Sequence, residues 1–174
     1  MLFRSATTTI AKTALYPAAV ATAANELVND ASLSFHYAVG TSYENGAAFG
    51  GYKPITELAD YVVKHTFYIT VIDGAIPAEN IVVKSLTIGG DSAVHVVVTS
   101  AYAAKEYEES FTTEDATTNL SGVTDGVPNK VTDETVLEVY VYIFYDGDET
   151  NVTTANAASL VDTNVQIVFG VAGA

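Results

Sequence analysis

Apolar and polar residues alternate along several stretches of the chain, with the period of two that is typical of a β-strand with one buried face. In the clearest stretch, the face that begins at Tyr61 is largely apolar. It consists of Tyr61, Val63, His65, Phe67, Ile69 and Val71, and the opposite face of Val62, Lys64, Thr66, Tyr68 and Thr70. Similar alternation predicts strands over 33–39, 136–145 and 164–170.

Two β-branched runs, 81–88 and 94–99, flank Gly89-Gly90-Asp91, and this turn sequence predicts that they form a hairpin. Six or seven short strands separated by turn residues favour an all-β protein, an antiparallel β-sandwich or jelly roll. Helical signals are weak: 101–110 suits a short helix or an irregular strand, and 154–160 a brief helix. The Thr-, Asp- and Asn-rich stretch 110–135 is interpreted as a long loop.

Residues 1–30 are interpreted as an extended N-terminal arm, and residues 31–174 as the β-sandwich domain. The arm is apolar and β-permissive, but Pro17 argues against a central strand. Two roles follow: the arm packs on its own domain, or it pairs with an open sheet edge of a neighbouring subunit. The candidate contact residues of the second role are Thr9, Ile10, Leu15, Tyr16 and Val20.

The chain is acidic, with 7 Lys and Arg against 21 Asp and Glu and a formal charge of -14. This balance excludes a nucleic-acid partner and an anionic membrane surface, because both require many basic contacts. No stretch approaches the roughly 20 apolar residues of a membrane helix, so we expect no membrane insertion. The absence of Cys excludes disulfides and thiolate metal sites, and the residues after Met1 contain no standard signal peptide.

Candidate metal ligands are sparse. His36, His65 and His95 lie in separate predicted strands without zincin spacing, and they are interpreted as structural histidines. The loop containing Asp146 and Asp148 resembles part of a calcium cage but lacks the spacing of an EF-hand loop, so a solvated turn is preferred and calcium binding is left open. An acidic group is interpreted as a hydrated face: Glu106, Glu108, Glu109, Glu114 and Asp115.

No motif for a nucleophile, a phosphate loop or a dinucleotide site occurs, so we expect no catalytic residues, no cofactor, no metal and no enzymatic activity. Asn119 and Asn151 begin Asn-x-Ser/Thr sequons in predicted loops and are possible glycosylation sites. The absence of Trp weakens a carbohydrate-binding interpretation without removing it.

The C-terminal stretch carries a family resemblance. A strand ending in Tyr145-Asp146-Gly147-Asp148 is followed by a Thr-x-Asn-Ala-x-x-Leu bridge over 154–160 and a Val-x-Ile-x-Phe strand over 165–169. This order resembles the tail of TasA- and camelysin-like secreted biofilm proteins, over 136–170 and more loosely over 61–99. The resemblance implies a jelly-roll sandwich that assembles into extracellular filaments, in which an N-terminal strand of one subunit completes the sheet of the next.

The leading hypothesis is therefore a structural subunit of an extracellular, cell-surface filament that polymerises with itself, head to tail, by donor-strand complementation. Minor filament proteins and cell-surface anchoring proteins are further expected partners. One alternative is a virion structural protein, such as a capsid, tail or decoration jelly roll. Another is a monomeric enzyme or carbohydrate-binding module.

Overall fold

The computed structural model describes residues 15–21, 33–38, 52–70, 81–90, 93–125, 127–129, 131, 135–147 and 164–173. Within these ranges the regular structure is almost entirely β-strand, with one short 3-10 helix, η3, at Leu58–Asp60. The strands are β1 Ala19–Val20, β2 Phe35–Ala38, β3 Tyr52–Pro54, β4 Val62–Ile69, β5 Ile81–Gly89, β6 Val94–Ser100, β7 Ala104–Tyr107, β8 Val123–Thr124, β9 Val127–Pro128, β10 Leu137–Tyr145 and β11 Asn164–Val171.

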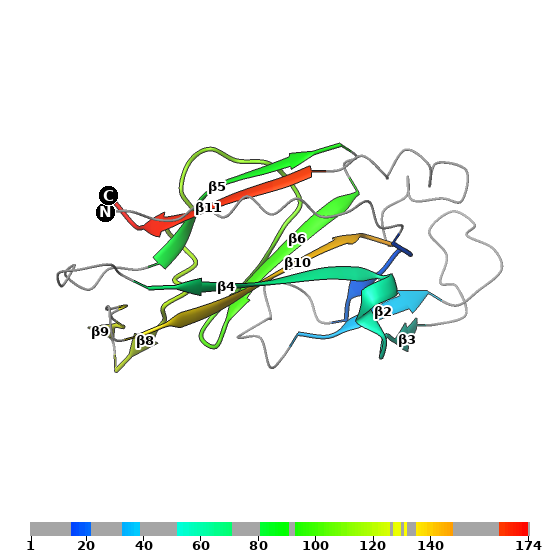
Figure 1. The fold of residues 1–174 in the computed structure, drawn as a ribbon, viewed down its shortest axis with the longest axis horizontal. Coiled ribbons are helices and arrows are strands. Elements are labelled where there is room, and N and C mark those ends of the chain that lie inside the picture. The colour runs from blue at the N-terminus through cyan, green and yellow to red at the C-terminus, as the bar shows by residue number, and fades with distance from the viewer. Residues whose placement is uncertain are drawn as a thin grey trace.

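A four-stranded sheet in the order β4-β10-β6-β7 forms the centre of the molecule. The β5–β11 pair packs on one face of this sheet, and the small β1-β2-β3 sheet packs on the other face near one end (Figure 1). All strand pairs are antiparallel. The prediction of an all-β antiparallel sandwich is confirmed, whereas the jelly-roll topology stays a prediction.

The central strands β6 and β10 explain why the sheet has two apolar faces. Every residue of β6 is buried, because β10 and β7 flank its edges and other strands cover both of its faces. Alternate residues separate into two clusters: Val96 and Val98 face β5 and β11, whereas Val97 faces β2. The aromatic side chains follow the same division, and Phe35 of β2 meets Phe144 of β10 at 5.2 Å between ring centroids.

Period-two alternation predicts the outer strands correctly. In β4, Lys64, Thr66 and Tyr68 are exposed, and Phe67 turns toward the core. In β11, Val165, Ile167 and Phe169 turn inward while the residues between them are exposed. Val71, at the end of the predicted first strand, lies outside the described residues.

The predicted hairpin of 81–88 with 94–99 is wrong. β5 pairs with β11, and β6 pairs with β10 and β7, so the chain crosses from one layer to the other between them. Gly90 has a φ of 112°, a conformation that suits a hairpin turn and a crossover between layers alike. The turn sequence therefore does not identify the strand that pairs with β5.

The structure decides between the two alternatives for 101–110 in favour of a strand, and it changes the loop prediction for 110–135. Of the stretch 101–110, residues Ala104–Tyr107 form strand β7, paired with β6. The stretch 110–135 contains the short hairpin β8–β9, and Phe111 forms an isolated bridge with Leu86 of β5. The predicted helix at 154–160 lies outside the described residues. None of the helices in the described part of the chain has the length and apolar character needed to cross a membrane.

Candidate functional site

The described part of the N-terminal arm, residues 15–21, is hydrogen-bonded to its own chain. Tyr16 N donates to Asp60 O at 2.8 Å, and Ala18 N donates to Tyr145 O at 2.9 Å. Gly147 N donates to Ala18 O, so Ala18 extends the sheet beside the end of β10. β1 then pairs with β2, and Ala21 N donates to Ser34 O at 2.8 Å.

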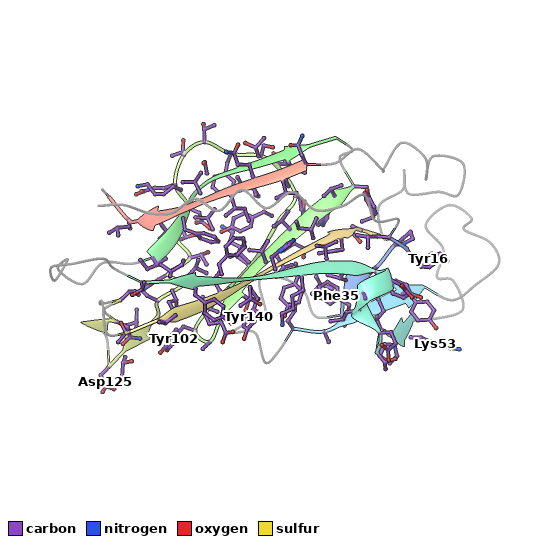
Figure 2. The ribbon with its side chains drawn as sticks, viewed as in Figure 1. Tyr16, Phe35, Lys53, Tyr102, Asp125 and Tyr140 are labelled. Atoms are coloured by element: carbon purple, nitrogen blue, oxygen red, sulfur yellow. The ribbon has the colours of Figure 1, made fainter. Side chains whose placement is uncertain are left out.

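Side chains of this segment also enter two core clusters. Ala18 is 1% exposed and packs with Phe35 and Phe144, and Val20 packs at the edge of the same cluster. Leu15 packs on the other face of the sheet against Val94 and Tyr145. Tyr16 remains largely exposed, with its ring 5.6 Å from that of Tyr61, at the end of the molecule that carries β2 and β3 (Figure 2).

The extended arm of residues 1–30 therefore needs a correction over 15–21. Leu15, Tyr16 and Val20 anchor the segment to its own subunit, which is the first of the two roles that the sequence leaves open. Gly147 leaves room for this anchored segment. It lies against Pro17, and a Cβ added at Gly147 would come within 3.3 Å of Pro17 Cβ. Thr9 and Ile10 lie outside the described residues.

The two long sides of the sandwich differ. On one side the loop 111–120 covers the edge of β5. Leu86 and Phe111 exchange both backbone hydrogen bonds, Asp115 N donates to Val83 O, and Leu120 N donates to Ile81 O. Leu120, the last residue of this loop, is fully buried. This side, the β5–loop edge, is closed by backbone pairing.

On the other side lie β4 and β11, the outer strands of the two layers. Phe67 and Phe169 meet there at 5.6 Å between ring centroids. Among the described residues, no backbone hydrogen bond joins β4 to β11. The inward-facing apolar side chains near this side come from β4, β11 and the neighbouring strand β10 and are only half-buried. We call them the β4–β11 margin: Phe67, Ile143, Val165, Ile167 and Phe169.

Leu15 connects the N-terminal segment to this margin. It belongs to a small cluster that contains the margin residues Ile143 and Val165. Leu15 is the first described residue of the segment, so the described structure begins beside the margin.

A second candidate site is a cluster of three ionisable side chains on the opposite face of the central sheet. His95 of β6 lies opposite Phe144 of β10, and Asp146 follows two residues later on the same face. Glu106 of β7 lies opposite Val97, one step further along that face. His95 Nδ1 is 2.7 Å from Glu106 Oε1 and 3.4 Å from Asp146 Oδ2.

This cluster is largely withdrawn from solvent. The side chains of His95, Glu106 and Asp146 are 4%, 13% and 17% exposed, and the His95 ring packs against Phe144. Burial lowers the pKa of His95, but the hydrogen bond to Glu106 and the nearby carboxylates of Asp146, Glu106 and Glu108 outweigh it and raise the pKa. The arrangement can hold a proton or a cation between two carboxylates.

The interpretation of the acidic residues as a hydrated face is wrong for three of them. Glu106 contacts His95, and Glu114 forms an ion pair with Lys84. The Asp115 carboxylate accepts hydrogen bonds from Lys105 Nζ at 2.8 Å and from Tyr107 OH at 2.9 Å. Glu106 thus joins β7 to β6, whereas Glu114 and Asp115 join the loop to strands, and their spacing in the sequence does not reveal these contacts.

Electrostatics around Asp115 follow from those contacts. Burial alone would raise the pKa of Asp115, but hydrogen bonds from Lys105, Thr117 and Tyr107 lower it well below its usual range. Burial and the adjacent carboxylate raise the pKa of the Tyr107 phenol. The hydrogen bond from Lys84 and that from the Gly173 backbone lower the pKa of Glu114.

The first sequon is part of a turn. Asn119 Oδ1 accepts hydrogen bonds from the backbone and hydroxyl of Ser121, and Asn119 Nδ2 donates to Gly122 O at 2.9 Å. Ser121 is 2% exposed. A glycan on Nδ2 would disturb this turn, so the structure favours a scaffold role for Asn119. Asn151 and Asp148 lie outside the described residues.

The three histidines do not come together. His36 and His65 lie on β2 and β4, and neither belongs to the His95 cluster. The spacing of His95, Glu106 and Asp146 along the sequence does not indicate the cluster. The pairing of 94–100 with 137–145 brings His95 close to Asp146.

Comparison with known proteins adds no relative: no family model, no curated protein and no solved structure matches this chain.

Proposed function

We propose that this protein is a non-enzymatic structural subunit of an extracellular, cell-surface filament. In this proposal each subunit donates residues 1–14, including Thr9 and Ile10, to the β4–β11 margin of the next subunit. Residues 15–21 remain anchored to the donor's own domain. The contact is heterologous and does not close on itself, so it propagates as a fibre.

The position of Leu15 carries the proposal. It packs beside Ile143 and Val165, so Leu15 lies at the long side where, among the described residues, β4 and β11 meet through side chains without a backbone hydrogen bond. Free strand edges attract additional strands, because each offers a row of unpaired backbone groups. Half-buried inward side chains such as Phe169 offer apolar surface that alternate residues of a donated strand would cover.

Length is compatible with this role. β4 and β11 each contain 8 residues, or about 27 Å at the usual strand rise. The 14 residues before Leu15 span up to about 46 Å when extended, which leaves a few residues to cross between subunits. The C-terminal stretch resembles TasA- and camelysin-like proteins. This resemblance supports donation of residues 1–14 to the next subunit over pairing of these residues with their own subunit.

The test removes residues 1–14 and keeps the anchor. A larger deletion, through residue 24, would also remove the buried Ala18 and Ala19 and would confuse loss of assembly with loss of the fold. We expect the full chain to form filaments under negative-stain electron microscopy. We expect the shortened chain to remain folded by circular dichroism, to elute as a monomer, and to bind a synthetic peptide of residues 1–14.

A matched pair of substitutions sharpens this test. Phe169→Ser alters an inward residue of the margin, whereas Val168→Ser alters its exposed neighbour on β11. We expect the first to weaken peptide binding at least tenfold and the second to leave it nearly unchanged. Filaments that persist without residues 1–14 would refute the mechanism. A full-length chain that stays monomeric under all conditions would refute the filament proposal and favour a binding module, and closed icosahedral or ring assemblies would favour a virion protein.

A further inference from the structure

We propose that His95, Glu106 and Asp146 form a binding site for one divalent transition-metal cation, with zinc as the best match. One imidazole nitrogen and two carboxylate groups converge from β6, β7 and the residue that follows β10, with their ligand atoms all within 4.8 Å of one another. This inference does not depend on the filament proposal, because the cluster lies on the opposite face of the central sheet from the β4–β11 margin.

The distances suit a tetrahedral ion. Zinc binds histidine nitrogen and carboxylate oxygen at about 2.0–2.2 Å, which places neighbouring ligand atoms about 3.3 Å apart. His95 Nδ1 lies 3.4 Å from Asp146 Oδ2 and 2.7 Å from Glu106 Oε1. The His95–Asp146 spacing matches this value, whereas the Glu106 carboxylate would have to move away from His95 Nδ1 to admit the ion. The remaining exposure of Glu106 and Asp146 gives solvent, and hence a fourth ligand, access to the site.

Charge favours a divalent ion at this position. Two carboxylates that are mostly withdrawn from water flank one imidazole, and a divalent cation with a neutral imidazole balances both of them. The nitrogen ligand discriminates among cations: calcium and magnesium prefer all-oxygen ligand sets, whereas imidazole suits zinc and its neighbours.

The backbone holds the three ligands in place. His95 and Glu106 lie on the paired strands β6 and β7. Asp146 N donates to Ala93 O at 2.8 Å, and the next residue, Gly147, donates to Ala18 O. An ion at the cluster therefore joins β6, β7 and the end of β10. It also stabilises the end of β10, to which residues 15–21 are hydrogen-bonded.

The test titrates the full chain, stripped with EDTA and dialysed, with zinc, calcium and magnesium separately by isothermal titration calorimetry. We expect one zinc ion per chain and at least tenfold weaker binding of the other two cations. Glu106→Gln and Asp146→Asn preserve side-chain shape, and each should weaken zinc binding by more than the roughly 10- to 100-fold that loss of an outer-shell partner costs. Glu109→Gln, an exposed neighbour, is the matched control and should bind zinc like the parent.

Hydrogen exchange gives a second readout that surface binding would not move. Zinc should increase protection of the backbone at 15–21 and 145–147 in the parent protein and in Glu109→Gln, but not in Glu106→Gln. Zinc binding that survives both ligand substitutions at parental affinity would overturn the proposal. So would the absence of saturable binding at one ion per chain. Circular dichroism establishes that each variant is folded, and the two ligand variants provide independent tests.

Discussion

The two long sides of the sandwich differ in how the edges of their outer strands are covered. At the β5–loop edge, the loop 111–120 supplies backbone partners for β5, and its last residue, Leu120, is fully buried. At the β4–β11 margin, side chains such as Phe67 and Phe169 meet without a backbone hydrogen bond between their strands, and they remain half-buried. One side of the domain is therefore complete within the described residues, and the other is suited to an added strand.

This contrast shows that burial within the domain depends on edge pairing as well as on residue type. Phe144 and Phe169 are the same residue type, but Phe144 lies on a central strand and is fully buried. Phe169 lies on an outer strand and keeps part of its surface exposed. Stability experiments on the isolated subunit should therefore separate the two positions.

The largest expected effect comes from truncating the central aromatic side chain. Phe144→Ala should lower the free energy of unfolding by about 3–5 kcal/mol, because it leaves a cavity between β10 and β2. Phe169→Ala should cost only about 1–2 kcal/mol in the monomer, because part of its ring is already in contact with water. Urea denaturation of both variants, in the chain lacking residues 1–14, measures the difference. Equal losses would show that the margin is as well packed as the centre.

The next effect concerns the closed side. Asp115→Asn removes the charge that pairs with Lys105 and should cost about 2 kcal/mol at neutral pH. Because the pKa of Asp115 is lower in the folded state than in the unfolded state, its contribution is fully present above the ordinary carboxyl pKa and is lost as the pH falls through the folded value. Urea titrations between pH 6 and about pH 2 should therefore show a steeper loss of stability in the parent than in the variant.

Glu109→Gln is the control for that pH series, because Glu109 is an exposed acidic residue between β7 and that loop. Its stability should stay within about 0.5 kcal/mol of the parent at each pH. If Asp115→Asn and the parent lose stability in parallel as the pH falls, the network around Asp115 does not stabilise the closed side electrostatically.

Sequence patterns predict the faces of individual strands well because each face depends on local alternation. The inward residues of β4 and β11 follow directly from period two. Strand pairing depends on contacts distant in sequence, and the Gly89-Gly90 turn gave the wrong partner for β5. The same limitation hid the His95 cluster, whose members come from three strands that only the pairing of β6 with β7 and β10 brings together.

The N-terminal arm illustrates a different limit. Its composition correctly indicated a β-permissive segment outside the main strands, but nothing local distinguishes an anchor from a donated strand. Ala18 is buried because Gly147 leaves room beside the end of β10, a contact between residues more than a hundred positions apart. The acidic residues of the closed side were likewise misjudged, because their partners Lys84 and Lys105 lie on strands that the loop crosses.

The smallest expected effect lies at the end of the loop that closes the β5 side. Asn119→Ala removes the side-chain bonds to Ser121 and Gly122 and should lower stability by about 1 kcal/mol. Thr113→Ala, an exposed substitution on the same loop, should change it by less than about 0.5 kcal/mol. Thermal denaturation of both variants tests this, and intact mass after expression in a glycosylating host should show Asn119 unmodified, because its amide nitrogen is engaged by Gly122 O. A glycan at Asn119, or equal stability of the two variants, would mean that this turn opens readily and that the closed side is less complete than its backbone pairing indicates.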